Sequence, residues 1–292
     1  MSDDTLRNEI LGDDGFASWL RREHPSGKAL EDGKALAEQA QVRVQAKLGS
    51  AVDCANVNDY LCRLLDAEYE IYLEMERELL EGAVEAFLTA DDAIRGKYPA
   101  LRSLLEGAQE HLSANHKPRK ALIAVSKPLA QFYKLLTESF AQSRKKRAGS
   151  SAEYQVEFIL NQLGYQGLYE RECKLNSEKV DFLFPSRAVW NEDKQRCAVL
   201  SVKRTLRERY KQVRAEIRAA GGAKVYLLSA QTETEAEKDL TPEKVRVIRQ
   251  QNVYLVVRDA IKRAHFSRKK RVLGFTDFFC KELPRLRAGW ED

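Results

Sequence analysis

The sequence is poor in the features that mark secreted, zinc-stabilised or membrane-inserted proteins. Its five cysteines are scattered and include no CxxC pair, which argues against a disulfide framework or a structural zinc site and favours a reducing cytosol. The four histidines show no metal-ligand spacing. No window approaches the roughly 18 apolar residues that a membrane span needs. The opening residues, MSDDTLRNEI, lack the apolar core of a signal peptide, so we expect a cytoplasmic protein without a membrane segment.

Length and charge are compatible with one large domain or two modest ones. The chain has 292 residues, and its hydrophobic fraction of 43% is enough for a full-sized core. The net charge is only +5, but basic residues cluster at 144–147 and 268–271. Such clusters suit phosphate groups of a nucleic acid, although each can equally be a solvated basic loop.

The first half of the chain has the periodicity of helices. Residues 27–48 are rich in Ala, Lys, Glu and Gln, and residues 57–88 repeat apolar side chains at helical spacing. The pattern breaks before two prolines and resumes over 122–140. We therefore predict a helical N-terminal region, residues 1–142, with a boundary estimated from composition and a role in DNA contact or dimerisation left open.

The second half alternates strand-length runs with helical stretches. The runs are apolar or β-branched and lie at 180–184, 198–203, 224–230 and 252–259. One helical stretch ends before a pair of glycines at 221–222, and another begins with Thr241-Pro242. This alternation predicts an α/β (α+β) domain over residues 143–292, with a mixed sheet flanked by helices.

Two of these runs carry charged residues suited to phosphodiester chemistry. In AVLSVK, Ser201 and Lys203 share a face, because side chains alternate along a strand. If this strand pairs antiparallel with VDFLF, Asp181 and Lys203 can converge at one end of the sheet. A carboxylate there can hold a hard divalent cation, and a lysine adds positive charge beside an attacking water. The alternative is a turn aspartate and a solvated strand-end lysine.

Glu216 offers a second carboxylate. It follows Arg209 by about two turns of the predicted helix, which places the two side chains nearly on one line. Glu216 can therefore reach a metal held by Asp181. It lies between Arg214 and Arg218, so a surface ion pair is the alternative.

The start of the same helix carries Arg207-Glu208-Arg209. Thr205 and Glu208 fit a capping box, in which the glutamate does no more than begin the helix. The other interpretation is a helix N-terminus that enters the DNA major groove. Arginine binds guanine O6 and N7 with two hydrogen bonds, and a carboxylate accepts from cytosine N4. Two arginines that flank a glutamate suit two adjacent G·C pairs, and both interpretations can hold together.

In this order, the motifs resemble the active-site and recognition residues of type II restriction endonucleases of the PD-(D/E)XK superfamily, in the group that cuts CCGG and CCNGG. The resemblance covers about residues 143–280, and Val180 stands where many relatives have proline. The helical N-terminal half resembles no family. The residues that carry the resemblance are Asp181, Ser201-Val202-Lys203, Arg207-Glu208-Arg209 and Glu216.

The resemblance assigns a role to each catalytic residue. Asp181 and Glu216 are expected to bind Mg²⁺, and Lys203 to assist the attacking water. The group also uses a glutamate on the helix before the first strand. Glu153 is preferred to Glu157 for this position because of its spacing from the preceding glycine.

The resemblance also implies how DNA is recognised. Arg207 and Arg209 are expected to recognise guanines, and Glu208 to bridge neighbouring cytosine amino groups. The implied enzyme is a homodimer that cuts palindromic double-stranded DNA before the first C and leaves 5′ overhangs. A cognate DNA methyltransferase is its implied genetic partner. The choice between CCGG and CCNGG, the outer base pairs, base flipping and oligomers above the dimer stay open.

Two other functions are compatible with the same residues. A DNA repair or junction nuclease would share Asp181, Lys203 and Glu216 but would use the arginines against phosphates. A non-catalytic DNA-binding protein would bind in a salt-sensitive way and show no metal-dependent cleavage.

Overall fold

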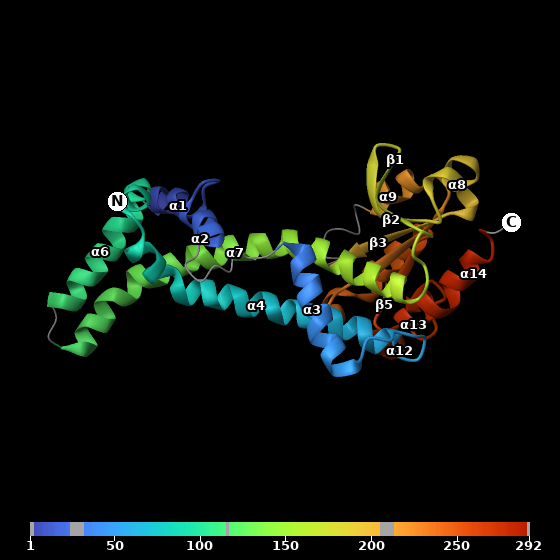
Figure 1. Cartoon of the computed structure of the whole chain (residues 1–292), viewed down its shortest axis with the longest axis horizontal. Coiled ribbons are helices and arrows are strands. Elements are labelled where there is room, and N and C mark those ends of the chain that lie inside the picture. The colour runs from blue at the N-terminus through green and yellow to red at the C-terminus, as the bar shows by residue number, and fades with distance from the viewer. Residues whose placement is uncertain (1–2, 24–31, 115–116, 205–212, 291–292) are drawn as a thin grey trace. The chain divides into compact units, whose positions relative to one another are not determined.

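The computed structural model describes residues 3–23, 32–114, 117–204 and 213–290 (Figure 1). The side chains of residues 143–149 and 213–216 also lie outside the description. The chain divides into two compact units, one of residues 1–32 and 70–147 and the other of residues 33–69 and 148–292. This division differs from the predicted segments 1–142 and 143–292, because residues 33–69 group with the C-terminal unit.

The described residues up to Gln162 are helical and contain no strand, as predicted. Their helices are α1 (Asp3–Leu11), α2 (Phe16–Glu23), α3 (Gly33–Leu48), α4 (Val57–Thr89), α5 (Asp92–Lys97), α6 (Pro99–Ala114) and α7 (Pro118–Gln162). Pro99 and Pro118 each occupy a first helical position, where the missing N–H of proline has no intrahelical partner to lose. Helix α7 continues through Pro128 and is longer than the periodicity predicts.

The unit of residues 1–32 and 70–147 has an aromatic core around Phe16. This ring is fully buried and lies 5.4 to 5.9 Å, between ring centroids, from Trp19, Phe87, Tyr98 and Phe132. These side chains come from α2, α4, the residue before α6, and α7. The aromatic contacts therefore hold together helices that are far apart in the sequence.

The other unit is built on a six-stranded mixed sheet with the strand order β1-β2-β3-β4-β5-β6. Strand β2 is antiparallel to both of its neighbours, β1 and β3, and strands β3 to β6 run parallel to one another. The strands are β1 (Glu170–Leu175), β2 (Glu178–Phe184), β3 (Ala198–Lys203), β4 (Lys224–Ser229), β5 (Tyr254–Val257) and β6 (Val272–Gly274). The mixed α/β class is confirmed, and β2 to β5 match the four predicted strands.

Two strands escaped the sequence pattern. The run ERECKL of β1 consists mostly of charged residues, so it lacks the apolar character used to predict strands. Strand β6 has only three residues. Both are edge strands, which receive their stability from pairing with a neighbour on one side only.

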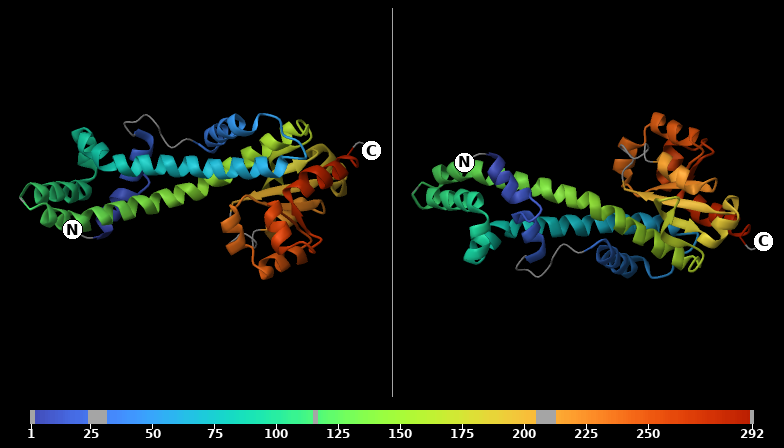
Figure 2. Two further views of the ribbon diagram at one scale, coloured as in Figure 1. Left: turned by 90° about the horizontal axis from the view of Figure 1, so that it is seen from below. Right: turned by 90° about the horizontal axis from the view of Figure 1, so that it is seen from above.

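Helices lie in the connections from β2 onward and after β6, and Figure 2 gives two further views of them. They are α8 (Arg187–Glu192), η1 (Lys194–Arg196), α9 (Val213–Ala220), α10 (Glu233–Asp239), α11 (Pro242–Gln250), α12 (Asp259–His265), α13 (Phe275–Asp277), η3 (Phe278–Glu282) and α14 (Leu283–Arg287). The predicted helix ends are present: Gly221 follows α9 with a φ of 57°, and Thr241 caps α11. Among the described helices, none combines the length and apolar character required to cross a bilayer.

Both faces of the sheet are covered. Leu227 and Leu255 belong to one hydrophobic core, whereas the preceding residues, Tyr226 and Tyr254, stack on each other with ring centroids 5.1 Å apart. Phe278 lies 5.2 Å from the Tyr226 ring. Because neighbouring residues of a strand point to opposite faces, β4 and β5 are buried on both sides, as is usual for parallel strands.

Two buried arginines attach the start of α4 to the sheet. Arg258, which follows β5, makes a two-pronged ion pair with Asp66, with N–O distances of 3.0 and 2.6 Å. Arg204, which follows β3, donates to Glu68 at 3.2 Å. Breaking such an ion pair strongly destabilises the protein, because the remaining buried charge loses its partner. They explain why residues 33–69 group with the sheet.

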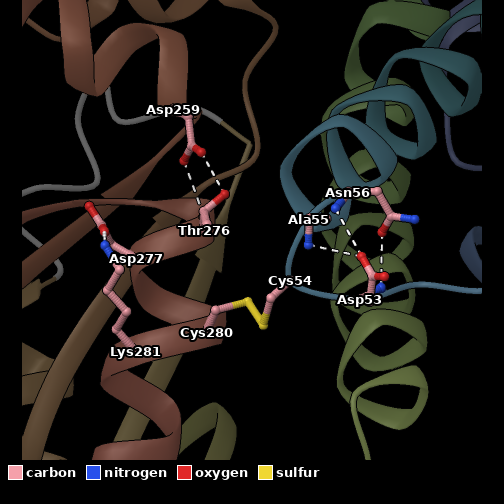
Figure 3. The surroundings of a disulfide bond; sticks show 9 residues. All are labelled: Asp53, Cys54, Ala55, Asn56, Asp259, Thr276, Asp277, Cys280 and Lys281. Atoms are coloured by element: carbon pink, nitrogen blue, oxygen red, sulfur yellow. Dashed lines mark hydrogen bonds and ion pairs between the residues drawn. A yellow bond between two sulfur atoms is a disulfide. The ribbon is translucent and has the colours of Figure 1, made fainter.

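A disulfide bond joins Cys54 to Cys280 (Figure 3). Cys54 lies in the loop before α4, and Cys280 lies in η3, with their Cα atoms 5.6 Å apart. The scattered cysteines argue against a disulfide framework, and the sequence pattern does not predict this single bond. The two residues are separated by 226 positions, and such a distant pairing leaves no spacing signal in the sequence.

We expect the oxidised protein to resist unfolding better than the reduced protein. A crosslink across a loop of this length restricts the unfolded chain, an effect of roughly 5 kcal/mol in the chain-entropy model. Urea unfolding with and without a thiol reductant measures the difference. The Cys280→Ser variant should show no dependence on reductant, and equal midpoints for the two forms of the wild-type protein would contradict the bond.

Candidate active site

The candidate site begins with Asp181 on β2, beside the carboxyl end of β3. The antiparallel register of the two strands pairs Phe182 with Leu200, which places Asp181 next to Ser201. One oxygen of Asp181, Oδ2, accepts hydrogen bonds from Ser201 Oγ at 3.0 Å, from Val202 N at 2.7 Å and from Lys203 Nζ at 2.9 Å. The strand pattern thus correctly predicts that Asp181 and Lys203 meet, and their catalytic roles stay predictions.

Asp181 and Lys203 form a half-buried ion pair. Their side chains are 14% and 13% exposed, so water screens their interaction only weakly. All three of these hydrogen bonds are made to Oδ2, which leaves Oδ1 outside them. The arrangement fixes the orientation of the carboxylate and holds the lysine ammonium at the end of β3.

Glu153 brings a second carboxyl group from α7. Its side chain is 15% exposed. Burial, followed by the charge of Asp181, raises the pKa of Glu153 to about 7, while Arg171 and Lys203 oppose the shift. The structure therefore places Glu153 within the electrostatic field of both Asp181 and Lys203.

Glu157, the other predicted candidate on α7, has different partners. It accepts from Arg171 Nη1 at 2.6 Å and from the hydroxyl of Tyr169 at 3.4 Å. Burial and the neighbouring Glu157 raise the pKa of Tyr169 to about 12, so this hydroxyl stays protonated at neutral pH. Glu153 is the glutamate that lies near Asp181. Glu157 instead binds Arg171 on β1 and Tyr169, the residue before β1.

The residue after Lys203 anchors the end of β3. Arg204 donates to Glu68 and to the carbonyl of Leu65, both on α4, and its guanidinium lies 5.6 Å from the centre of the Tyr69 ring. Glu68 is almost completely buried, and this burial raises its pKa although Arg204 opposes the shift. Helix α4 therefore supports the backbone that carries Lys203.

Several predicted residues lie outside the described part of the chain. Arg207, Glu208 and Arg209 fall within residues 205–212, and the proposed helix cap at Thr205 falls there too. Glu216 belongs to α9, but its side chain is not described. The roles of these residues in metal binding and DNA recognition stay predictions.

The basic run at 268–271 directly precedes β6. Through the register of the parallel strands, Val272 at the start of β6 is level with Leu255, Leu227 and Ser201, so the run ends near the level of the middle of β3 and three strands away from it. Its role in positioning phosphates stays a prediction. The side chains of the other run, 144–147, lie outside the description.

The donor groups at the site suit a hard divalent cation. Asp181 and Glu153 supply carboxylate oxygens, the ligand type that Mg²⁺ prefers. The raised pKa of Glu153 reflects repulsion from Asp181 as well as burial, and a cation would relieve this repulsion. Among the side chains that the structure describes, no group of three His, Cys, Asp or Glu is close enough to hold a metal, so a complete set of ligands needs a group such as Glu216, water or DNA.

The sequence pattern missed Arg171 and Arg204. Arg171 lies on β1, whose charged sequence gave no strand signal. Arg204 lies next to the predicted lysine, but its partner Glu68 is on a helix 136 positions earlier. Only the tertiary structure brings these charges together, so no local spacing could have identified them.

The sequence is similar to a known protein family and to a curated relative. Residues 112–279 match the family model described as EcoRII C terminal. The type II restriction enzyme SsoII of Shigella sonnei is 26% identical over 149 residues, which are 49% of this chain and 47% of SsoII. The chain thus spans about half the length of this curated relative.

Solved structures of restriction endonucleases share the fold. Metal-depleted Ecl18kI in complex with uncleaved, modified DNA matches with a TM-score of 0.71 and 19% identity, over 95% of this chain and 85% of Ecl18kI. PspGI in complex with substrate DNA matches with a TM-score of 0.55 and 17% identity, over 89% of this chain and 95% of PspGI. The fold expected from the resemblance, a PD-(D/E)XK mixed sheet flanked by helices, is confirmed. Since its family model covers more than half of the sequence, the chain belongs to the EcoRII C-terminal family.

Proposed function

We propose that this protein is a type II restriction endonuclease that hydrolyses phosphodiester bonds in double-stranded DNA with Mg²⁺. The observation that carries the proposal is the contact between Lys203 and Asp181, 2.9 Å long, on adjacent strands of a restriction-endonuclease fold. A structural ion pair would need only one acceptor and one donor. Here the strand register brings Ser201, Val202 and Lys203 to the same carboxylate oxygen.

The relatives support this function. SsoII is a type II restriction enzyme, and PspGI is a restriction endonuclease solved with its substrate DNA. Ecl18kI was solved metal-depleted and with uncleaved DNA, which is consistent with a metal requirement. We extend these properties to the present chain because it belongs to the EcoRII C-terminal family.

Lys203 supplies positive charge where negative charge develops during hydrolysis. Its ammonium is held by Asp181 and by its position at the end of β3, and it is only 13% exposed. A fixed cation in a weakly screened site stabilises charge on the reacting phosphate more than a mobile cation in water does. Lys203 also orients the attacking water.

Asp181 and Glu216 would hold the Mg²⁺ ion, and Glu153 adds a further carboxylate nearby. When bound, the metal polarises the phosphodiester and lowers the pKa of water. Three hydrogen bonds to Oδ2 fix the orientation of the Asp181 carboxylate. Its other oxygen, Oδ1, therefore points in a defined direction.

Sequence recognition is assigned to Arg207, Glu208 and Arg209. They follow the lysine strand directly, so the groups that recognise bases and the groups that cut are joined by one short segment. The site would be a palindrome with CC and GG half-sites, either CCGG or CCNGG, cut before the first C to leave 5′ overhangs. A palindrome calls for a two-fold symmetric homodimer, in which each subunit reads one half-site.

Digestion of a sequenced plasmid with Mg²⁺ tests the function. We expect discrete cuts at one palindrome containing CC and GG, and a loss of at least about 100-fold in rate for Lys203→Ala and Asp181→Ala. Lys174→Ala, which changes an exposed lysine on β1, is the matched control and should cut normally. Cuts without sequence preference would favour a repair or junction nuclease, and binding without any cut would favour a non-catalytic DNA-binding protein.

Base substitutions within the mapped site test the recognition residues. Each wrong base pair in the CC and GG half-sites should weaken binding by about 1–3 kcal/mol, because an arginine or Glu208 loses a hydrogen-bonding partner. Competition binding with Ca²⁺ in place of Mg²⁺ measures this loss. Equal affinity for all substituted duplexes would contradict base recognition by this segment.

The pKa of Glu153 predicts a pH-dependent stability. Its pKa is about 7 in the folded protein against 4.5 as the ordinary value, so the folded state binds the extra proton between these values. The contribution of Glu153 to stability is therefore present at low pH and lost as the pH rises through 7. In EDTA, the free energy of unfolding of the wild-type protein should fall relative to Glu153→Gln between pH 5 and pH 8. Parallel pH curves for the two proteins would rule out this shift.

A further inference from the structure

Arg171 lies between two glutamates on successive turns of α7. It reaches from β1, where its guanidinium is 2.6 Å from Glu157 Oε2 and 3.5 Å from Glu153 Oε2. The same guanidinium lies 3.6 Å from the centre of the Tyr154 ring. Its side chain is 16% exposed. Arg171 is therefore held by three neighbouring residues of one helix.

The two ion pairs of Arg171 are unequal. The short bond to Glu157 and the contact with Tyr154 fix the guanidinium, since a planar cation over an aromatic face has little freedom to rotate. The longer distance to Glu153 is an electrostatic contact outside the range of a direct hydrogen bond. Arg171 thus attracts Glu153 without a short hydrogen bond to it, and the Glu153 carboxylate can also interact with a second partner.

The charges around the site lead to a specific balance. Arg171 and Glu157 neutralise each other, and on the neighbouring strands Glu172 and Lys179 form a pair 2.9 Å apart. Among the side chains that the structure describes, the groups that remain at the site are the carboxylates of Asp181 and Glu153 and the ammonium of Lys203. When Glu153 is ionised, their sum is one negative charge, which favours the binding of a cation.

We propose that Arg171 is a positioning residue that holds the Glu153 carboxylate toward Asp181 and Lys203, with Glu157 and Tyr154 fixing its guanidinium. This inference rests on the proposed function for its catalytic consequence. It assigns Glu157 a role that differs from that of Glu153, although the two side chains share one face of α7. It also gives β1, an edge strand separated from the lysine strand by β2, a direct part in the site.

The test is a double-mutant cycle between Arg171→Met and Glu153→Gln. Methionine keeps the length of the side chain and removes its charge. We expect Arg171→Met to lower the single-turnover cleavage rate by about 10- to 100-fold, the usual effect of losing a group that orients a metal-site ligand. DNA affinity measured in EDTA, without a metal, should change less than about twofold. In the Glu153→Gln background, Arg171→Met should have little further effect, because its target is gone.

Further variants separate positioning from a general loss of structure. Arg171→Lys keeps the charge but loses the planar fork, so it should restore only part of the rate. Arg196→Met is the matched control: Arg196 also belongs to this unit, but it binds the carbonyls of Gly289 and Trp290. This control should cleave DNA at the wild-type rate.

A readout that does not depend on cleavage is the binding of Ca²⁺ to the protein–DNA complex, followed by calorimetry. Arg171→Met should weaken it by about 10-fold or more, and the cycle with Glu153→Gln should again be non-additive. Additive effects of the two substitutions on Ca²⁺ binding would overturn the inference. If the wild-type protein fails to cut any DNA while the cycle stays non-additive, the proposed function fails and the positioning of Glu153 by Arg171 stands.

Discussion

The candidate site depends on the three hydrogen bonds that converge on Asp181 Oδ2. They require β2 and β3 to be antiparallel and in a register that pairs Phe182 with Leu200. A shift of one residue would turn Asp181 away from Lys203, because side chains alternate between the faces of a strand. Such a shift is costly, because Phe182 and Leu183 are fully buried on opposite faces of the strand and would both lose their packing partners. Ordinary hydrophobic packing thus determines the geometry of the charged site.

Charged groups are concentrated at this end of the sheet in paired form. Arg204 meets Glu68, Arg171 meets Glu157, and Lys203 meets Asp181. Unpaired buried charges are strongly unfavourable, so a site that collects two or more carboxylates needs cations from its surroundings. The raised pKa of Glu153 marks the place where this compensation is incomplete. Such a remaining imbalance is typical of a binding or catalytic site, where a ligand completes the charge balance.

The helical segment of residues 33–69 is part of this arrangement. Through Asp66 and Glu68, α4 contacts the residues that follow β5 and β3, and Cys54 is bonded to Cys280. The ends of two parallel strands are therefore supported by residues from the first quarter of the chain. In α/β sheets the carboxyl ends of parallel strands are the usual place for ligands. Here they are supported by α4, a helix that precedes all of the strands in the sequence.

By itself the sequence determined the elements and the central pair of the site. The alternation of strand-length runs and helices predicted β2 to β5, and the two-residue period predicted that Ser201 and Lys203 share a face, because these signals are local. The tertiary structure alone decided which distant groups complete the site. The pairing of the charged strand β1, the partnership of Arg204 with Glu68 and the Cys54–Cys280 bond all join segments far apart in the sequence. Strand order and register, which no local pattern encodes, decide which of these charges meet.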